Sequence, residues 1–175
     1  MNNYVDIKIL SSDHKTKFNL IGRTMTIIHA FNQNLKKAGE NSVMAIDFPE
    51  LMESDTAPNF GSIMRIFGSR EALVALHVNP FMAKCTDDCV VALSPPKVTP
   101  DSDNFVQLRQ CRRAERAIAK GLKPEQNTLP YVIIQRKSQG RATPTFIKRT
   151  TTQSKGDELF NTYGLCLANS TIPSF

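Results

Sequence analysis

The hydrophobic residues near the start of the chain follow two different periods. Between residues 3 and 10, apolar and polar residues alternate, which is typical of a half-buried strand. Its apolar side consists of Val5, Ile7 and Ile9. Between residues 19 and 38 the apolar residues recur at helical spacing, and Gly39 suits the position just past the end of a helix. A strand followed by an amphipathic helix is therefore predicted.

Later apolar runs in the first half predict three more strands, at residues 42–48, 62–67 and 89–93. A short helix is predicted at 70–78 and is expected to end at Asn79-Pro80. The resulting order, β-α-β-β-α-β, is that of the ferredoxin-like fold, which RNA-recognition (RRM) domains also use. We therefore predict a ferredoxin-like, RRM-like domain over residues 1–96.

The second half of the chain has a different pattern and begins with a Pro- and Asp-containing linker at residues 97–104. A short, strongly basic helix is predicted at 112–120, before Gly121. Strands are predicted at 105–111, 131–135, 145–147 and 159–167. The fold class expected for the whole chain is α+β, with a smaller C-terminal α/β half at 97–175 that carries the basic helix.

The net charge of +6 is unevenly distributed along the chain. Residues 105–124 carry six basic side chains and one acidic one, and residues 136–149 carry five basic side chains and no acid. The rest of the chain therefore has a net charge of −4. Two strongly basic segments on a mildly acidic body indicate a surface that binds a polyanion, and two solvated basic loops are the alternative.

Composition disfavours several classes of function. No run approaches the roughly 18 apolar residues of a membrane span, and the N-terminal residues lack the pattern of a secretory signal. A cytoplasmic protein with reduced cysteines is therefore expected. Cys85 and Cys89 lie far from the other two cysteines, and Asp87-Asp88 stands without a third carboxylate. No metal site and no cofactor are therefore expected.

The three histidines are His14, His29 and His77. His29 lies at the border of the apolar stripe of the first predicted helix, where a packed or solvated histidine is the commoner outcome. RNA can be cut without metal, however, when its own 2′-hydroxyl attacks the adjacent phosphate and a neutral histidine takes the proton. Residues 136–141 have the composition of a phosphate-binding loop.

A series of short motifs occurs in a specific order along nearly the whole chain. The motifs are Tyr4-Val5-Asp6-Ile7-Lys8, Ile28-His29-Ala30-Phe31, Phe48-Pro49-Glu50-Leu51, Met64-Arg65-Ile66, Leu129-Pro130-Tyr131-Val132, Ser138-Gln139-Gly140, Phe146-Ile147-Lys148-Arg149, Tyr163-Gly164-Leu165 and Pro173-Ser174-Phe175. In this collinear series the sequence resembles the type I-F CRISPR RNA-processing endoribonucleases, the hairpin-cutting subunits of the type I-F surveillance complex.

The resemblance implies a metal-independent endoribonuclease that cuts a CRISPR precursor RNA at the 3′ base of a repeat hairpin. Such an enzyme leaves a 2′,3′-cyclic phosphate and stays bound to the mature guide RNA. The implied partners are this RNA and other subunits of a type I-F surveillance complex, in bacterial antiviral defence and without a membrane. By the correspondence of motifs, His29 is the base, Ser138 steadies the nucleophile or phosphate, and Tyr163 orients the histidine or the upstream nucleotide.

The resemblance also implies which residues bind RNA. The family presents a basic helix to the RNA stem, and here Arg112, Arg116 and Lys120 share one helical face. Arg109 and Gln110 match the position that reads base edges near the bottom of the stem, where arginine suits guanine and glutamine suits adenine. The full predicted set is Arg109, Gln110, Arg112, Arg113, Arg116, Lys120, Arg136, Lys137 and Arg141.

Two other functions stay open at this point. Arg136 stands where the family has the first serine of its serine loop, and Thr143 stands where the family has an aromatic residue. These differences favour, as the alternative, a non-catalytic subunit that caps the hairpin within a CRISPR complex. An unrelated RRM-like protein is disfavoured, because the aromatic strand motifs that stack bases in RRM domains are not evident.

Overall fold

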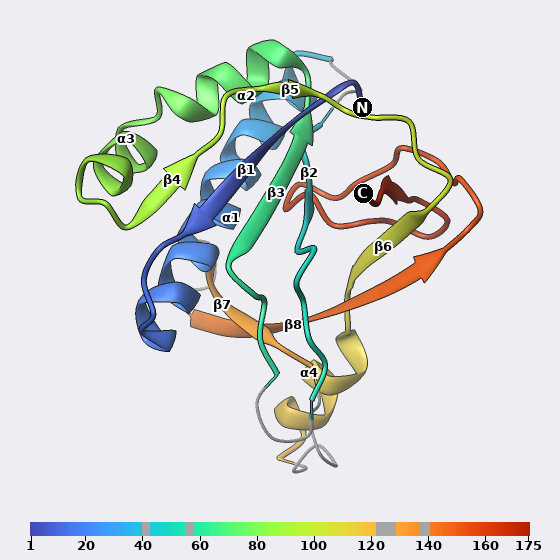
Figure 1. Cartoon of the computed structure of the whole chain (residues 1–175). Coiled ribbons are helices and arrows are strands. Elements are labelled where there is room, and N and C mark those ends of the chain that lie inside the picture. The colour runs from blue at the N-terminus through green and yellow to red at the C-terminus, as the bar shows by residue number, and fades with distance from the viewer. Residues whose placement is uncertain (40–42, 55–57, 122–128, 137–140) are drawn as a thin grey trace.

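The computed structural model describes residues 1–39, 43–54, 58–121, 129–136 and 141–175. These residues form two antiparallel sheets and four helices (Figure 1). The first half contains β1 (Asn3–Ile9), α1 (His14–Lys37), β2 (Ala45–Asp47), β3 (Ile63–Gly68), α2 (Arg70–His77), α3 (Pro80–Asp87) and β4 (Val91–Leu93). The second half contains β5 (Lys97–Val98), β6 (Phe105–Gln110), α4 (Arg112–Ala119), β7 (Tyr131–Arg136), β8 (Arg141–Thr152) and β9 (Ile172–Pro173).

The first sheet comes mainly from the N-terminal half. Its strands lie in the order β4-β1-β3-β2, every pairing is antiparallel, and β5 also pairs with β1. Val5, Ile7 and Ile9 are buried, which confirms the alternation predicted for β1. They belong to one hydrophobic cluster with Ile21 and Ile28 of α1. The α+β class is therefore confirmed, and the strand order is consistent with the predicted ferredoxin-like fold, with α3 as an additional helix.

The second sheet has the order β7-β8-β6-β9 and shares its core with the first. Leu108, Val132 and Ile147 belong to the same hydrophobic cluster as the inner residues of β1. Helix α1 lies against β7 so closely that a Cβ on Gly22 would come within 2.8 Å of the Ile133 carbonyl oxygen. Both halves of the chain therefore contribute to the core around α1, and the division into residues 1–96 and 97–175 stays a prediction.

The other face of the first sheet is covered by residues of the segment 160–175. Phe67 of β3 packs in a second hydrophobic cluster with Phe160. The Arg65 guanidinium lies 4.2 Å from the centre of the Phe175 ring and donates to the Phe175 backbone oxygen at 2.9 Å. RRM domains leave this face open so that aromatic side chains can stack on bases. Here the protein's own side chains occupy it.

Local capping explains where the helices begin and end. Helix α1 begins earlier than the predicted residue 19, because the Asp13 carboxylate accepts a hydrogen bond from the Thr16 backbone N–H at 2.7 Å. Gly39 has a φ of +79°, the left-handed conformation expected just past a helix end. Neither α1 nor any other helix in the described ranges is long and apolar enough to cross a membrane.

Two sequence-based predictions of elements were wrong. Asn79-Pro80 ends α2 as expected but also begins α3, because the Asn79 side chain caps that helix and proline fits its first turn. Residues 159–167 were predicted as a strand and form only a single bridge, Phe160 with Cys166. Most of their other backbone hydrogen bonds close turns within the segment, such as Asn161 N–H to the Leu165 carbonyl, so no continuous ladder forms there.

A buried ion pair joins the two sheets. Arg149 of β8 donates to both carboxylate oxygens of Asp47 in β2, at 2.9 and 3.0 Å. The Asp47 side chain is 1% exposed and the Arg149 side chain 15%. A carboxylate this deeply buried depends on its partner, because an unpaired charge in the protein interior is poorly solvated.

We expect Arg149→Met to lower the free energy of unfolding by about 3–5 kcal/mol, because it leaves the Asp47 carboxylate buried without its partner. The double variant Asp47→Asn/Arg149→Met should recover much of this loss, since no charge is then left in the interior. Urea denaturation of the single and double variants measures both effects, with the exposed Arg70→Met as the matched control. A single variant as stable as this control would contradict the prediction.

Candidate active site and nucleic-acid interface

Two of the three residues predicted to act in catalysis lie against each other. His29 is on α1, and Tyr163 is on the loop between β8 and β9. Their ring centres are 4.1 Å apart and the ring planes differ by 11°, so the rings are stacked nearly parallel. The third residue, Ser138, lies outside the described residues. The structure therefore brings His29 and Tyr163 together from distant parts of the sequence.

The loop that carries Tyr163 is fixed from within. The Asn161 side-chain oxygen accepts hydrogen bonds from the backbone N–H groups of Tyr163 at 2.8 Å and Leu165 at 3.1 Å. Gly164 has a φ of +79°, and a Cβ there would come within 2.9 Å of the Ile46 side chain. A glycine is required at this position, since both the backbone conformation and the close approach exclude a side chain.

The same loop is hydrogen-bonded to both sheets. The backbone N–H of Ile46 in β2 donates to the Gly164 carbonyl at 3.0 Å. The backbone N–H of Cys166 donates to the carbonyl of Leu108 in β6 at 2.8 Å. The loop from 161 to 166 therefore has a defined position relative to each sheet, and Tyr163 directly precedes the first of these two attachments.

The environment of His29 favours the neutral imidazole. Burial lowers the pKa of His29 below the ordinary value of 6.5, because the desolvated ring is harder to charge. Its Nδ1 atom is buried and has no hydrogen-bond partner among the described residues. Buried polar atoms are nearly always paired in folded proteins, so an unpaired ring nitrogen is an unusual feature of this position. A neutral histidine can accept a proton at physiological pH.

The predicted basic helix is present as α4. It spans eight residues, or about two turns. Four basic side chains are exposed here: Arg112, Arg113 and Arg116 on the helix, and Lys120 directly after its last residue. The helix follows β6 directly and also contacts β8, so both strands hold it in place. Helix α4, which carries these cations, lies at one end of the molecule (Figure 1).

A second positive position lies beside α4 on the second sheet. Arg109 of β6 is paired in register with Lys148 of β8. Like charges directly opposite each other in an antiparallel pair repel, and the Arg109 Nε atom is buried without a partner among the described residues. Lys148 belongs to the basic segment 136–149 predicted to bind a polyanion, but the sequence did not single it out as an RNA-binding residue. Its place beside Arg109 depends on the register of β6 and β8, which the sequence pattern does not give.

Strand geometry also bears on the predicted base-reading pair. Successive side chains of a strand point to opposite faces of the sheet. Arg109 and Gln110 are neighbours in β6 and therefore point to different faces, whereas Gln107 shares the face of Arg109. The base-reading roles of Arg109 and Gln110 stay predictions.

The remaining predicted RNA-binding residues lie around the connection between β7 and β8. Arg136 and Arg141 are the facing ends of these two strands and are paired in register. Lys137 lies outside the described residues, as Ser138 does. The backbone of the hairpin thus brings Arg136 and Arg141 to one place in the fold.

The cysteines and acids form no site next to His29. All four cysteines are free thiols, and burial raises the pKa of Cys166 to about 11, so this thiol stays protonated at physiological pH. In the part of the chain that the structure describes, no three His, Cys, Asp or Glu side chains are grouped as metal ligands would be.

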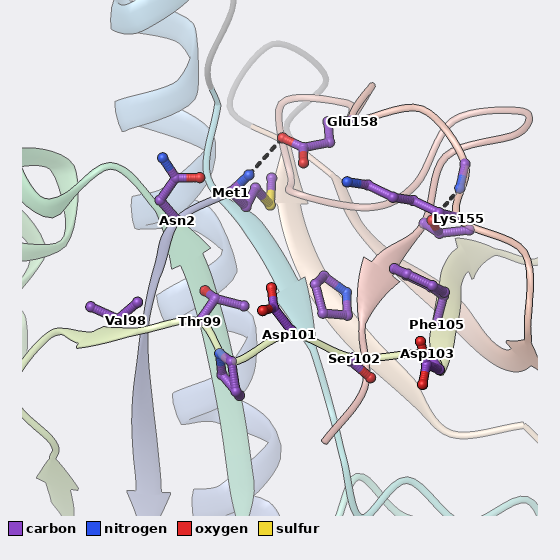
Figure 2. Close-up of a pocket in the computed structure, with 14 residues that line it drawn as sticks. Met1, Asn2, Val98, Thr99, Asp101, Ser102, Asp103, Phe105, Lys155 and Glu158 are labelled. Atoms are coloured by element: carbon purple, nitrogen blue, oxygen red, sulfur yellow. Dashed lines mark hydrogen bonds and ion pairs between the residues drawn. The ribbon is translucent and has the colours of Figure 1, made fainter.

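A cavity of about 390 Å³ lies away from these residues, between the N-terminal residues, the 98–103 linker and the segment around Lys155 (Figure 2). Its lining carries three acidic side chains, Asp101, Asp103 and Glu158, and the basic Lys155, and Glu158 pairs with the Met1 amino group at 2.7 Å. Among the residues that the structure describes, none of the predicted catalytic or RNA-binding residues lines it. Its excess of acidic side chains does not suit a polyanion.

Comparison with known families settles the affiliation of the chain. The family model described as CRISPR-associated protein (Cas_Csy4) matches residues 4–121 and 107–175. The chain belongs to this family. Cas_Csy4 is the family of the type I-F CRISPR endoribonuclease, so the protein is assigned to CRISPR-associated RNA processing. A comparison with individual curated proteins gives no match.

We expect His29 of the free protein to titrate with a pKa below 6.5, measured by NMR of the imidazole carbons as a function of pH. Tyr163→Ala should raise this pKa towards 6.5, because it removes a ring that shields the imidazole from water. Tyr163→Phe keeps the ring and should keep the pKa low, which makes it the matched control. A pKa of 6.5 or more in the wild-type protein would show that the imidazole is not desolvated.

Proposed function

We propose that this Cas_Csy4 protein is a metal-independent endoribonuclease that cuts a CRISPR precursor RNA at the 3′ base of its repeat hairpin. The 2′-oxygen of the nucleotide before the cut forms a bond to the adjacent phosphorus, and the bond from phosphorus to the 5′-oxygen breaks. The products are a 2′,3′-cyclic phosphate and a 5′-hydroxyl. The protein then stays bound to the mature guide RNA as a subunit of a type I-F surveillance complex.

The observation that carries this proposal is the His29–Tyr163 stack. His29 takes the proton of the 2′-hydroxyl, which suits its lowered pKa because the imidazole is then neutral at physiological pH. Tyr163 holds the plane of the imidazole through the 4.1 Å ring contact. Ser138 steadies the nucleophile or the phosphate. The proton that His29 has taken is passed to the 5′-oxygen as its bond to phosphorus breaks.

The RNA stem binds on the positive surface formed by α4 and the neighbouring strands. Arg112, Arg113, Arg116 and Lys120 contact phosphates, and Arg109 contacts a base edge at the bottom of the stem. Lys148, opposite Arg109, adds a further phosphate contact. Arg136, Lys137 and Arg141 extend this surface along the connection between β7 and β8. The support is the concentration of exposed cations on and beside α4, Arg112, Arg113, Arg116, Lys120 and Lys148.

The second candidate is a hairpin-capping subunit that binds the same RNA without cutting it. Arg136, which replaces the first serine of the family's serine loop, favours this alternative. A guanidinium donates hydrogen bonds but cannot accept the proton of a 2′-hydroxyl or share it as a serine hydroxyl does. The two candidates share the RNA surface and differ only in the chemical step.

We expect the wild-type protein to cleave a hairpin of its own CRISPR repeat in excess EDTA, and to leave the RNA intact when the nucleotide before the cut is 2′-deoxy. His29→Ala should slow cleavage by about 10²–10⁴-fold and keep the affinity for the hairpin, because it removes proton transfer and no phosphate contact. His77→Ala, another half-buried helical histidine, is the matched control. Tight binding without cleavage by the wild-type protein would instead establish the capping function.

The positively charged surface at α4 leads to a separate prediction. We expect Arg112→Gln/Arg116→Gln to weaken hairpin binding and to reduce the slope of log affinity against log salt by about 1.4–1.8, since each lost phosphate contact removes about 0.7–0.9. Arg70→Gln/Lys84→Gln removes the same charge from α2 and α3, which lie at the opposite end of the molecule from α4 (Figure 1). An equal change in both double variants would mean that the RNA does not bind specifically at α4.

A further inference from the structure

A buried asparagine lies one helical turn after His29. Asn32 is on the same helix, and its side chain is fully buried, with 0% exposure. Its Nδ2 atom donates to the Met44 carbonyl at 2.9 Å and to the Thr162 carbonyl at 3.2 Å. Its Oδ1 atom accepts from the Met44 backbone N–H at 2.8 Å. One amide group thus connects α1, the residue just before β2, and the residue just before Tyr163.

An asparagine is costly at such a position, and the sequence pattern predicts an apolar residue there. Burial of an amide destabilises a protein unless its hydrogen bonds are made, and here both amide hydrogens and the oxygen have partners. A leucine would fill the volume without this cost. The residue type therefore calls for an explanation beyond packing.

The hydrogen bond to Thr162 gives the explanation. Gly164 and Cys166 attach the loop to the two sheets, and neither bond fixes it relative to α1. Asn32 supplies that connection one residue from Tyr163. Lys36 also reaches the loop from α1, but its contact with the Phe160 carbonyl is 3.4 Å long and comes from an exposed side chain.

We propose that Asn32 is a positioning residue for the reaction: it holds the Tyr163 loop against α1 and thereby keeps the imidazole of His29 in the orientation that proton transfer requires. This inference rests on the proposed function of His29. Asn32 touches neither RNA nor the reacting atoms, and it acts through the ring contact between Tyr163 and His29. Misplacement of a reacting group by about 1 Å can cost on the order of 100-fold in rate.

The test compares Asn32→Leu and Asn32→Ser with two controls on the same helix. Asn34→Leu makes the same chemical change at an exposed position. Thr24→Val removes a buried hydroxyl that bonds to the Met82 sulfur, away from the Tyr163 loop, and reports general destabilisation. Asn32→Ser leaves room for water, so it provides a folded variant if leucine is not accepted.

We expect the Asn32 variants to lower the single-turnover cleavage rate at saturating hairpin by about 10- to 100-fold, with the dissociation constant within about twofold of wild type. NMR should show the pKa of His29 rising towards 6.5, as the tyrosine ring moves away and water reaches the imidazole. Both controls should keep the wild-type rate and the wild-type His29 titration.

Wild-type cleavage and an unchanged His29 titration in a folded Asn32 variant would overturn the proposal. A loss of rate matched by Thr24→Val would also overturn it, because the effect would then be one of stability. If the wild-type protein does not cleave RNA at all, the proposed function fails, and the His29 titration still tests whether Asn32 positions the Tyr163 ring.

Discussion

The loop at residues 161–166 depends on hydrogen bonds to three separate parts of the fold. Its backbone is bonded to β2 through Gly164 and to β6 through Cys166, and Asn32 of α1 bonds to it from the third side. The three attachments are made by three different elements, β2, β6 and α1. The ring contact between His29 and Tyr163 is therefore a consequence of the whole tertiary structure rather than of local sequence. The loop also connects α1, the helix of His29, to β6, and β6 leads directly into the basic helix α4.

The candidate active site combines two opposed electrostatic environments. His29 is partly desolvated, which favours its neutral form, while the cations of α4 and the Arg109–Lys148 pair give the adjoining surface a strong positive potential. In the proposed complex with RNA, the phosphates would neutralise the positive potential of this surface.

Sequence patterns predicted the elements with a single clear period, and failed where several partners share one segment. The alternation in β1 and the helical period of α1 correspond to faces buried in one core, so periodicity was sufficient there. Asn79-Pro80 was predicted only to end a helix, although the same residues that end one helix can also cap the next. The contact of His29 with Tyr163, and the buried bonds of Asn32, join residues far apart in the chain. Hydrophobic periodicity does not predict these contacts. His29 and Tyr163 were identified only through the motif series and the family resemblance that it carries.

The contact between Arg65 and Phe175 has a consequence for how the protein is made. The strands β1, β2 and β3 of the first sheet are complete in sequence at residue 68, but residues 160–175 that cover their outer face follow much later. At about 5–20 residues per second, a ribosome needs roughly 5–20 s to produce the intervening chain. During that interval Tyr4 and Phe67 are exposed on a nascent sheet, where another unfinished chain or a chaperone can reach them. Coverage of this face by residues 160–175 therefore has to wait until the end of synthesis.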